Sequence, residues 1–335
     1  MSGSLTMGRW LRALAAYAVP FILCGVLLPF CGPELLSHPV GPETSPTIQG
    51  QTNSFILYQL RLPRVILGLL VGGALAIAGA GFQVILRNPL AEPYTLGATG
   101  GAAVGAVLAI SVPGLASLFG PSVQIFALAG AAVSLGLVYR LARRPHGLSM
   151  STLLLAGVTV SILCGGLIMF IRYFAAPEDH VRTTLWLMGG LGVVGYREIA
   201  TLIVLLLPGL AMLLTQTSAL NHLSLGDQMA AGHGVEVSDV QRMAFLGGGV
   251  LTAGAVSVAG PIGFVGLIVP HAVRRLSGYD QRVVLPASFL LGGAFLTVCD
   301  TAARLIFAGR DLPVGVVTAL VGGPLFIKIL LGRRR

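Results

Sequence analysis

The stretch Arg61–Gly97, RLPRVILGLLVGGALAIAGAGFQVILRNPLAEPYTLG, sets the fold class of this 335-residue chain. Its apolar part ends at Leu86 and is long enough to cross a bilayer, because a helix rises about 1.5 Å per residue and the hydrocarbon core is about 30 Å thick. Arg87 then marks the interface. Glycines at four-residue spacing, such as Gly68 and Gly72, predict that neighbouring helices approach closely. The stretch therefore predicts a packed membrane helix followed by a polar turn.

The composition of the whole chain extends this prediction. Only 10% of the residues are charged, and 55% are hydrophobic. A soluble domain carries about 25% charged residues, so this chain lacks the polar groups to cover a surface in water. The net charge of +9 raises nucleic acid as a partner, but the arginines lie at the ends of apolar runs, as in membrane proteins. We predict an all-α, polytopic membrane helical bundle that binds no nucleic acid.

Ten segments are candidates for crossing the membrane. They are Trp10–Phe30, Arg64–Leu86, Leu96–Val112, Ser122–Leu141, Thr152–Phe174, Ile199–Thr215, Met243–Val258, Ile262–Val273, Val283–Phe307 and Val314–Leu331. Ile262–Val273 is too short to cross lipid alone, but it can cross when other helices surround it. Counting it places the arginine clusters on one side of the membrane, as the positive-inside rule requires. We predict about ten transmembrane helices in a single domain, residues 1–335, with both termini in the cytoplasm.

One polar segment interrupts this apolar chain, Gln216–Arg242, QTSALNHLSLGDQMAAGHGVEVSDVQR. The ten-span count places it in the cytoplasm. A channel or a secondary carrier does not need such a segment, whereas a membrane protein driven by a cytoplasmic engine needs a surface that the engine can hold. The segment therefore favours the membrane half of a motor-driven transporter.

The sequence offers no constellation for bond chemistry. No two of the six histidines have i,i+4 spacing, no cysteines form CxxC, and HExxH and GxxxxGK[ST] are both absent. Asp300 is the only acid well inside a predicted span, and Arg304 one turn later is its expected ion-pair partner. We therefore expect a protein that is not an enzyme and that binds no metal or cofactor itself.

Three arginines are predicted at the outer face, against the general pattern: Arg61, Arg64 and Arg304. One interpretation is that they anchor helix ends at the interface. The other is a basic docking patch for an acidic partner outside the cell membrane. The residues alone leave both interpretations open.

Three long segments carry a resemblance to a known family. They are Arg61–Gly97; LNHLSLGDQMAAGHGVEV, Leu220–Val237; and GPIGFVGLIVPHAVRRLSGYDQRVVLPAS, Gly260–Ser288, which is followed by GRDLPVGVVTAL, Gly309–Leu320. Together they resemble the FecCD family of permeases, the membrane subunits of type II ABC importers for ferric siderophores, haem and cobalamin. The resemblance runs from about Arg61 to the C-terminus and is not specific for the cargo.

The resemblance implies an inner-membrane homodimer with one pathway between two copies, two ABC ATPase subunits that hold ATP and Mg, and a periplasmic substrate-binding protein. It implies alternating access driven by the ATPases, and it favours the docking role for Arg61, Arg64 and Arg304. The polar segment would contact the ATPase through Leu220, Leu223, Leu225, Gly226, Asp227, Met229, Ala230, Gly232, Gly234 and Val235. The cytoplasmic gates would be Asn88 and Leu90 (first gate) and Ser149, Met150 and Ser151 (second gate), with Ser161, Cys164 and Met169 as pathway candidates.

Two other classes compete with the importer interpretation. A secondary transporter would need ionisable groups near the midplane, and the spans offer none beyond Asp300. A membrane enzyme would need the missing constellation. Among the family's cargoes, ferric siderophore is the first choice on family breadth alone, with haem and cobalamin or another corrinoid next.

Overall fold

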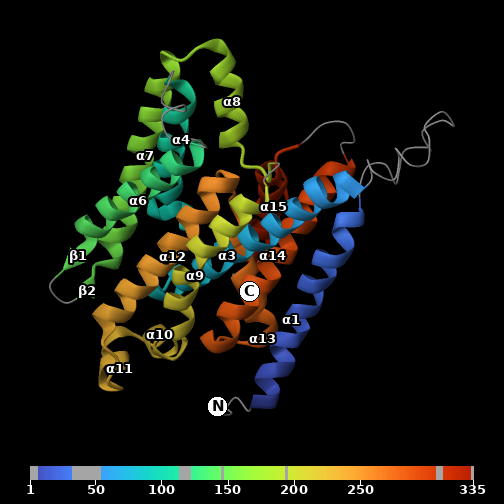
Figure 1. Ribbon diagram of the computed structural model, residues 1–335. Helices are drawn as coiled ribbons and strands as arrows, with labels where there is room; N and C mark the ends of the chain where they lie inside the picture. The colour runs from blue at the N-terminus through green and yellow to red at the C-terminus, as the bar shows by residue number, and fades with distance from the viewer. Residues whose placement is uncertain are drawn as a thin grey trace.

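The computed structural model describes residues 7–31, 54–112, 122–144, 147–192, 195–306 and 312–332. Most of the outer loop 31–58 and the C-terminal arginines lie outside the described residues. The described chain is almost wholly helical, and its helices form one bundle (Figure 1). The fold-class prediction is confirmed.

Each predicted span coincides with a helix. The helices are α1 (Met7–Leu27), α3 (Leu62–Ile85), α4 (Ala98–Ser111), α6 (Ser122–Ala142), α7 (Met150–Tyr173), α9 (Tyr196–Thr215), α12 (Val237–Ala259), α13 (Val265–Ser277), α14 (Gln281–Ile306) and α15 (Val314–Gly332). Among the described residues, seven helices are long and apolar enough to cross a membrane, and Ala98–Ser111 and Val314–Lys328 are shorter apolar helices. With its 13 residues, α13 is shorter still. The number of crossings and the side of the termini stay predictions.

Several short elements were not predicted. Before α3 lies a π-helical turn, η3 (Ile56–Arg61), and η1 (Leu28–Phe30) and η4 (Pro93–Leu96) are 3-10 turns. Strands β1 (Arg143–Arg144) and β2 (Gly147–Leu148) pair antiparallel between α6 and α7. After α7 comes α8 (Pro177–Leu187), with Pro177 at its start and Glu178 and Asp179 in its first turn, which are favourable residues at a helix N-terminus.

The centre of the bundle is α3, which is buried along nearly its whole length. It packs against α14, α12 and α13. A Cβ atom at Gly72 would lie 2.3 Å from the backbone oxygen of Gly292 on α14, and one at Gly101 on α4 would lie 2.3 Å from that of Gly130 on α6. Any larger side chain would therefore push these helices apart. The prediction that four-residue glycine spacing marks close helix packing is confirmed.

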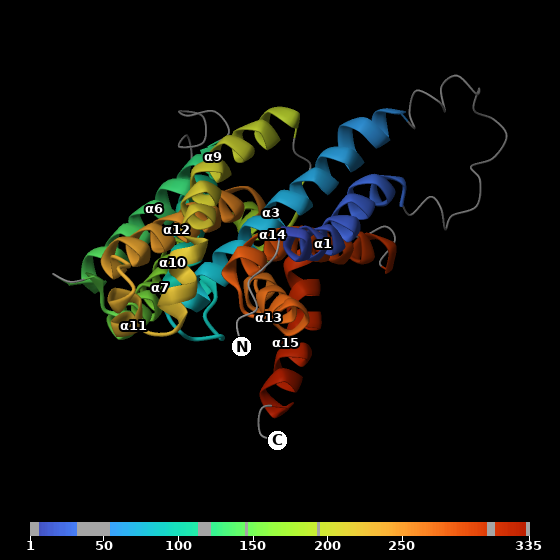
Figure 2. The same cartoon turned by 90° about the horizontal axis from the view of Figure 1, so that it is seen from below.

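The periphery of the bundle is apolar and exposed. Helix α7 presents large side chains such as Leu155, Ile162 and Tyr173 to the outside, and α15 does so with Leu320 and Leu331. Helix α15 packs on α14 and α13, and in the view from below it leads away from the other helices (Figure 2). Lipid or another protein must cover these faces, because exposing such a large apolar surface to water is unfavourable.

The two ends of the bundle differ. The polar segment, the start of α1 and the end of α13 lie at one end (bottom of Figure 1). The connection between α7 and α8 lies at the opposite end. We call the first the polar-segment end and the second the outer end.

Candidate functional site

The polar segment folds into two short helices between α9 and α12. These are α10 (Thr217–Ser224) and α11 (Asp227–Gly232). Gly226 and Gly234 on either side of α11 have φ of 125° and 78°, which glycine adopts without strain. Sharp turns at these glycines set α11 off from its neighbours.

The five larger or fully buried apolar residues among the ten predicted to contact the ATPase, leaving Val235 aside, form two groups. Leu220, Leu223 and Ala230 are fully buried and hold the segment against the bundle. Leu225 and Met229 are 62% and 53% exposed, although they lie on the most polar part of the chain. Large exposed apolar side chains in a polar setting mark a protein contact surface. The first group thus supports the segment, and the second is available to a partner.

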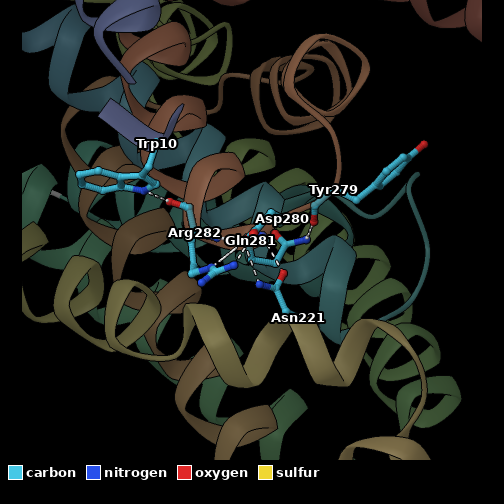
Figure 3. Close-up of polar contacts among 6 residues, drawn as sticks. All are labelled: Trp10, Asn221, Tyr279, Asp280, Gln281 and Arg282. Carbon is cyan, nitrogen blue, oxygen red and sulfur yellow. Dashed lines mark hydrogen bonds and ion pairs between the residues drawn. The ribbon is translucent and has the colours of Figure 1, made fainter. Parts of the chain in front are cut away.

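A polar cluster ties α10 to the loop between α13 and α14 (Figure 3). Both amide atoms of Asn221 are used: Nδ2 donates to Asp280 Oδ1 (2.8 Å), and Oδ1 accepts from the backbone N–H of Gln281 (2.7 Å). The Asp280 carboxylate also accepts hydrogen bonds from Nε and Nη2 of Arg282. The Arg282 carbonyl accepts from the Trp10 indole on α1 (3.0 Å). Asn221 therefore connects the polar segment to the start of α14, and Arg282 connects that point to α1.

Electrostatics favour the ionised form of Asp280. Burial alone would raise the pKa of this carboxyl, but the hydrogen bonds from Arg282 and Asn221 outweigh burial and hold the pKa below its ordinary value. The cluster therefore stays intact at neutral pH and loses stability only as the pH falls through that lowered pKa.

Asp227, the first residue of α11, lies between the two predicted gates. Its carboxylate forms an ion pair with Arg87, which directly precedes the first gate. The same oxygen accepts from Gln241 Nε2 at 3.5 Å, and Gln241 Oε1 accepts from the backbone N–H of Leu148 at 3.0 Å. Leu148 directly precedes the second gate. The segment is thereby connected to the first predicted gate through Asp227 and to the second through Gln241, and these two side chains meet each other.

Polar contacts also shape the gate loops themselves. Asn88 Oδ1 accepts from the Leu90 N–H (3.0 Å), which closes a tight turn in the first gate. Ser149 is the N-cap of α7 and accepts from the Thr152 N–H. Ser151 lies 3.4 Å from Ser149 between hydroxyl oxygens. Met150 packs partly against the core.

The first gate loop is joined to α13 through Glu92. Its carboxylate accepts the backbone N–H of Phe264, at the start of α13. Burial raises the pKa of Glu92 to about 7, even though the bond from Phe264 opposes the shift. This carboxyl therefore titrates near neutral pH.

At the outer end, the three predicted docking arginines surround or adjoin Asp300. Arg64 donates from Nε (3.0 Å) and Nη2 (2.9 Å) to the two oxygens of Asp300, and Arg304 Nε lies 3.3 Å from Oδ2. The Asp300 side chain is only 2% exposed, and those of Arg64 and Arg304 are 15% and 11% exposed. The predicted Asp300–Arg304 pair is confirmed, and Arg64 is a second partner that spacing did not reveal. Arg61 lies in η3, one turn before Arg64.

The three pathway candidates on α7 have different surroundings. Cys164 is buried and faces α4, where a Cβ at Gly100 would contact it. The hydroxyl of Ser161 donates to the Gly157 carbonyl of its own helix (2.8 Å). Met169 is 77% exposed. Cys164 therefore belongs to the interior of the protomer, and Met169 to its outer surface.

Sequence reasoning missed the roles of Asn221, Asp280, Gln241 and Glu92. Their partners lie between 59 and 172 residues away, so spacing carried no signal. A weak signal existed for Glu92, which is an acid in a short, otherwise apolar turn. Among the described residues, no three His, Cys, Asp or Glu side chains are grouped to hold a metal ion.

Comparison with known proteins gives concordant results. The model of the FecCD transport family matches residues 5–332. The cobalamin import system permease protein BtuC of Halobacterium salinarum is 42% identical over 87% of this chain and 75% of its own length. The vitamin B12 import system permease protein BtuC of Salmonella paratyphi A is 38% identical over 98% of this chain and 96% of its own.

A solved structure agrees with these relatives. It is described as an inward-facing conformation of a metal-chelate type ABC transporter, and it superposes with a TM-score of 0.80 at 28% identity. The superposition covers 96% of this chain and 99% of the other. The resemblance inferred from the three motifs is confirmed over nearly the whole chain. The chain belongs to the FecCD transport family of ABC importer permeases and is a multi-pass protein of the cytoplasmic membrane.

Proposed function

We propose that two copies of this chain form the membrane pathway of an ATP-driven importer for cobalamin or a closely related corrinoid. The observation that carries the proposal is the polar segment, which presents exposed Leu225 and Met229 and contacts the first predicted gate loop through Asp227 and the second through Gln241. A force applied to that surface from the cytoplasm would reach both gates. The permease itself performs no bond chemistry.

The choice of cargo rests on the relatives. Both BtuC proteins named above are cobalamin or vitamin B12 permeases, and the second aligns with nearly the whole chain. This moves cobalamin ahead of ferric siderophore, which was the first choice on family breadth, and of haem. The gate and pathway residues add nothing to this choice, because small hydroxyl and apolar groups suit any bulky chelate.

The homodimer is supported by the exposed faces of α7 and α15. Both are apolar helices with large side chains that are exposed in the single chain. In the proposed dimer they face the second copy across the pathway. In alternating access, this interface then opens in turn at the outer end and at the polar-segment end.

A periplasmic binding protein is the proposed partner at the outer end. Arg64 and Arg304 share the carboxylate of Asp300, and Arg61 lies one turn before Arg64. Acidic side chains on the binding protein would be attracted to this cluster. The arginines are pre-oriented by Asp300, which lowers the entropy lost on docking.

Reconstitution tests the proposal. The permease is placed in liposomes with the ATPase and binding protein of its own organism, and uptake of labelled cobalamin is measured with and without ATP. We expect uptake that requires all three proteins and ATP. Uptake driven by an ion gradient in the absence of the ATPase would refute the importer, and uptake of a ferric siderophore alone would refute the cargo.

A matched pair of variants tests the contact surface. Leu225→Asp combined with Met229→Asp should release the ATPase on gel filtration. Leu276→Asp, at another exposed apolar position near the polar-segment end, should leave the complex intact. Retention of the ATPase by the double variant would contradict the proposed contact.

The gradient-driven alternative has little support. Asp300, the one acid well inside a predicted span, is engaged by two arginines and is therefore a poor site for a transported ion.

A further inference from the structure

A large cavity opens at the polar-segment end of the bundle, beside the contact surface, with which it shares Leu225. Its volume is about 670 Å³. Three parts of the chain build its walls: the end of α3 with the first gate, the end of α10, and α13 with the loop that follows it. The lining residues are Gln83, Val84, Arg87, Pro89, Ser224, Leu225, His271, Arg274, Arg275, Tyr279 and Gln281.

The charge of the lining is one-sided. It contains three arginines and no aspartate or glutamate among the described residues. One of the three, Arg87, is paired with Asp227 outside the lining set, which leaves Arg274 and Arg275 without a carboxylate in the cavity wall. The positive-inside rule explains why arginines occur at this end. It does not explain why they gather around one cavity.

The position of the Arg274 side chain is fixed by a buried residue of another helix. Gln83 on α3 is 4% exposed, and its amide donates to the backbone oxygens of Gly266 (3.1 Å) and Leu267 (3.4 Å). Its side-chain oxygen accepts from Arg274 Nη1. A buried glutamine thus fixes both the backbone of α13 and the guanidinium on that helix. The remaining N–H groups of Arg274 keep a defined place in the wall of the cavity.

Gln281 supplies a different feature. It is 2% exposed, and its side-chain oxygen has no hydrogen-bond partner. A buried acceptor of this kind is costly unless a donor reaches it. A ligand that carries a hydroxyl or amine beside its negative charge would satisfy the oxygen and the arginines together.

We propose that this cavity is a binding site for a phosphate ester, held by Arg274 and Arg275 and recognised through a neighbouring hydroxyl or amine by Gln281. Arginine forks match phosphate oxygens, and basic pockets between helix ends on the cytoplasmic side are suited to phospholipid headgroups. The same chemistry is offered by a membrane lipid such as phosphatidylglycerol and by a soluble phosphate ester. Since Ser224 and Leu225 form part of the wall, an occupant would also brace the polar segment against the bundle.

Two binding measurements on the full-length permease separate the sources. In the first, lipid retained per chain is quantified by mass analysis after transfer from mixed phosphatidylglycerol and phosphatidylcholine micelles. In the second, glycerol 3-phosphate is titrated calorimetrically into protein stripped of anionic lipid. Selective retention of phosphatidylglycerol that competes with glycerol 3-phosphate supports a lipid headgroup, and glycerol 3-phosphate binding that the lipid does not displace supports a soluble ester.

Matched variants test the residues. Arg274→Gln with Arg275→Gln should lower the affinity roughly thirtyfold, from about tenfold or less per arginine at a charged surface. Arg12→Gln with Arg140→Gln removes the same charge from exposed positions outside the cavity and should have little effect. Ser224→Asp places a negative charge in the wall and leaves every arginine in place, so it should also weaken binding without disturbing the fold. Thermal midpoints of all variants are compared with the wild type.

Three results would overturn the proposal. The first is a wild-type protein that binds neither compound, and the second is an equal loss of binding in both arginine pairs, which would indicate general surface potential. The third is an ATPase that occupies the cavity with its own acidic side chains, seen as loss of ATPase binding in Arg274→Gln/Arg275→Gln with phosphate binding absent. None of the binding measurements needs the ATPase or the cargo, so their outcome is independent of the proposed transport function.

Discussion

The bundle contains an arginine–aspartate contact at each end, and the two contacts are built for different purposes. At the outer end, Asp300 is 2% exposed and is held by two arginines that are themselves mostly buried. At the polar-segment end, the Arg87 and Asp227 side chains are 42% and 48% exposed and join two elements that pack only lightly. Breaking a buried pair leaves uncompensated charge, whereas an exposed pair separates at little cost. The buried contact is therefore suited to a part of the bundle that stays fixed, and the exposed contact to a part that separates.

The largest effect should come from Asp300. Asp300→Ala leaves Arg64 and Arg304 without their shared carboxylate, and we expect a loss of about 3–5 kcal/mol, seen as a lower thermal unfolding midpoint in detergent. The triple variant Arg64→Gln/Asp300→Asn/Arg304→Gln should lose less, because no charge is left unpaired. If Asp300→Ala has the same thermal midpoint as the wild type, the ion pairs at Asp300 do not stabilise the fold.

A smaller effect is expected at Asn221. Asn221→Ala removes the hydrogen bonds to Asp280 and from Gln281, and we expect about 1–3 kcal/mol of local destabilisation because one partner is charged. Hydrogen exchange should rise in α10 while α3 stays protected. Ser218→Ala, at an exposed position on the same helix, is the control. If hydrogen exchange in α10 is unchanged in Asn221→Ala, the burial of Leu220 and Leu223 alone holds this helix against the bundle.

Glu92 should make the stability of the folded protein depend on pH, with an effect intermediate in size between those of the two arginine–aspartate contacts. Its pKa is raised in the folded protein, so its contribution favours the folded state at low pH and is lost as the pH rises through about 7. We expect the folded state to lose about 1 kcal/mol between roughly pH 6 and pH 8. Glu92→Gln should remove this part of the slope in thermal unfolding. The same slope in the variant would assign the pH dependence to other groups.

The Arg87–Asp227 pair should have the smallest effect on stability and a distinct effect on transport. A double-mutant cycle should give about 0–1 kcal/mol, because both side chains are half exposed. Asp227→Asn should nevertheless raise the ATP hydrolysed per cargo molecule in proteoliposomes, since it weakens the connection to both gates. The swap Arg87→Asp/Asp227→Arg should restore part of the coupling. A normal ratio in Asp227→Asn would leave Gln241 and packing as the transmitters.

The local sequence predicted many of the important residues at the two ends of the bundle. It predicted few of the contacts that those residues make with distant parts of the chain. The i,i+4 spacing gave the Asp300–Arg304 pair, because one helical turn brings those side chains together. Arg64 was predicted at the outer face, but its bond to Asp300, which spans 236 residues, was not predicted. In the polar segment, composition predicted a cytoplasmic contact surface. It did not separate buried Leu220, Leu223 and Ala230 from exposed Leu225 and Met229, because burial depends on what packs above each residue.

The sequence by itself determined that this is a helical membrane protein with one polar segment, because hydropathy and helix length act over about 20 neighbouring residues. Its motifs also determined the family. Only the tertiary structure decided that Asp227 and Gln241 together join the two predicted gate loops, that Gln83 fixes Arg274 in a basic cavity, and that two arginines share Asp300. Each of these contacts depends on the packing of distant helices, which close approaches such as Gly72 on Gly292 constrain. No local pattern records that alignment.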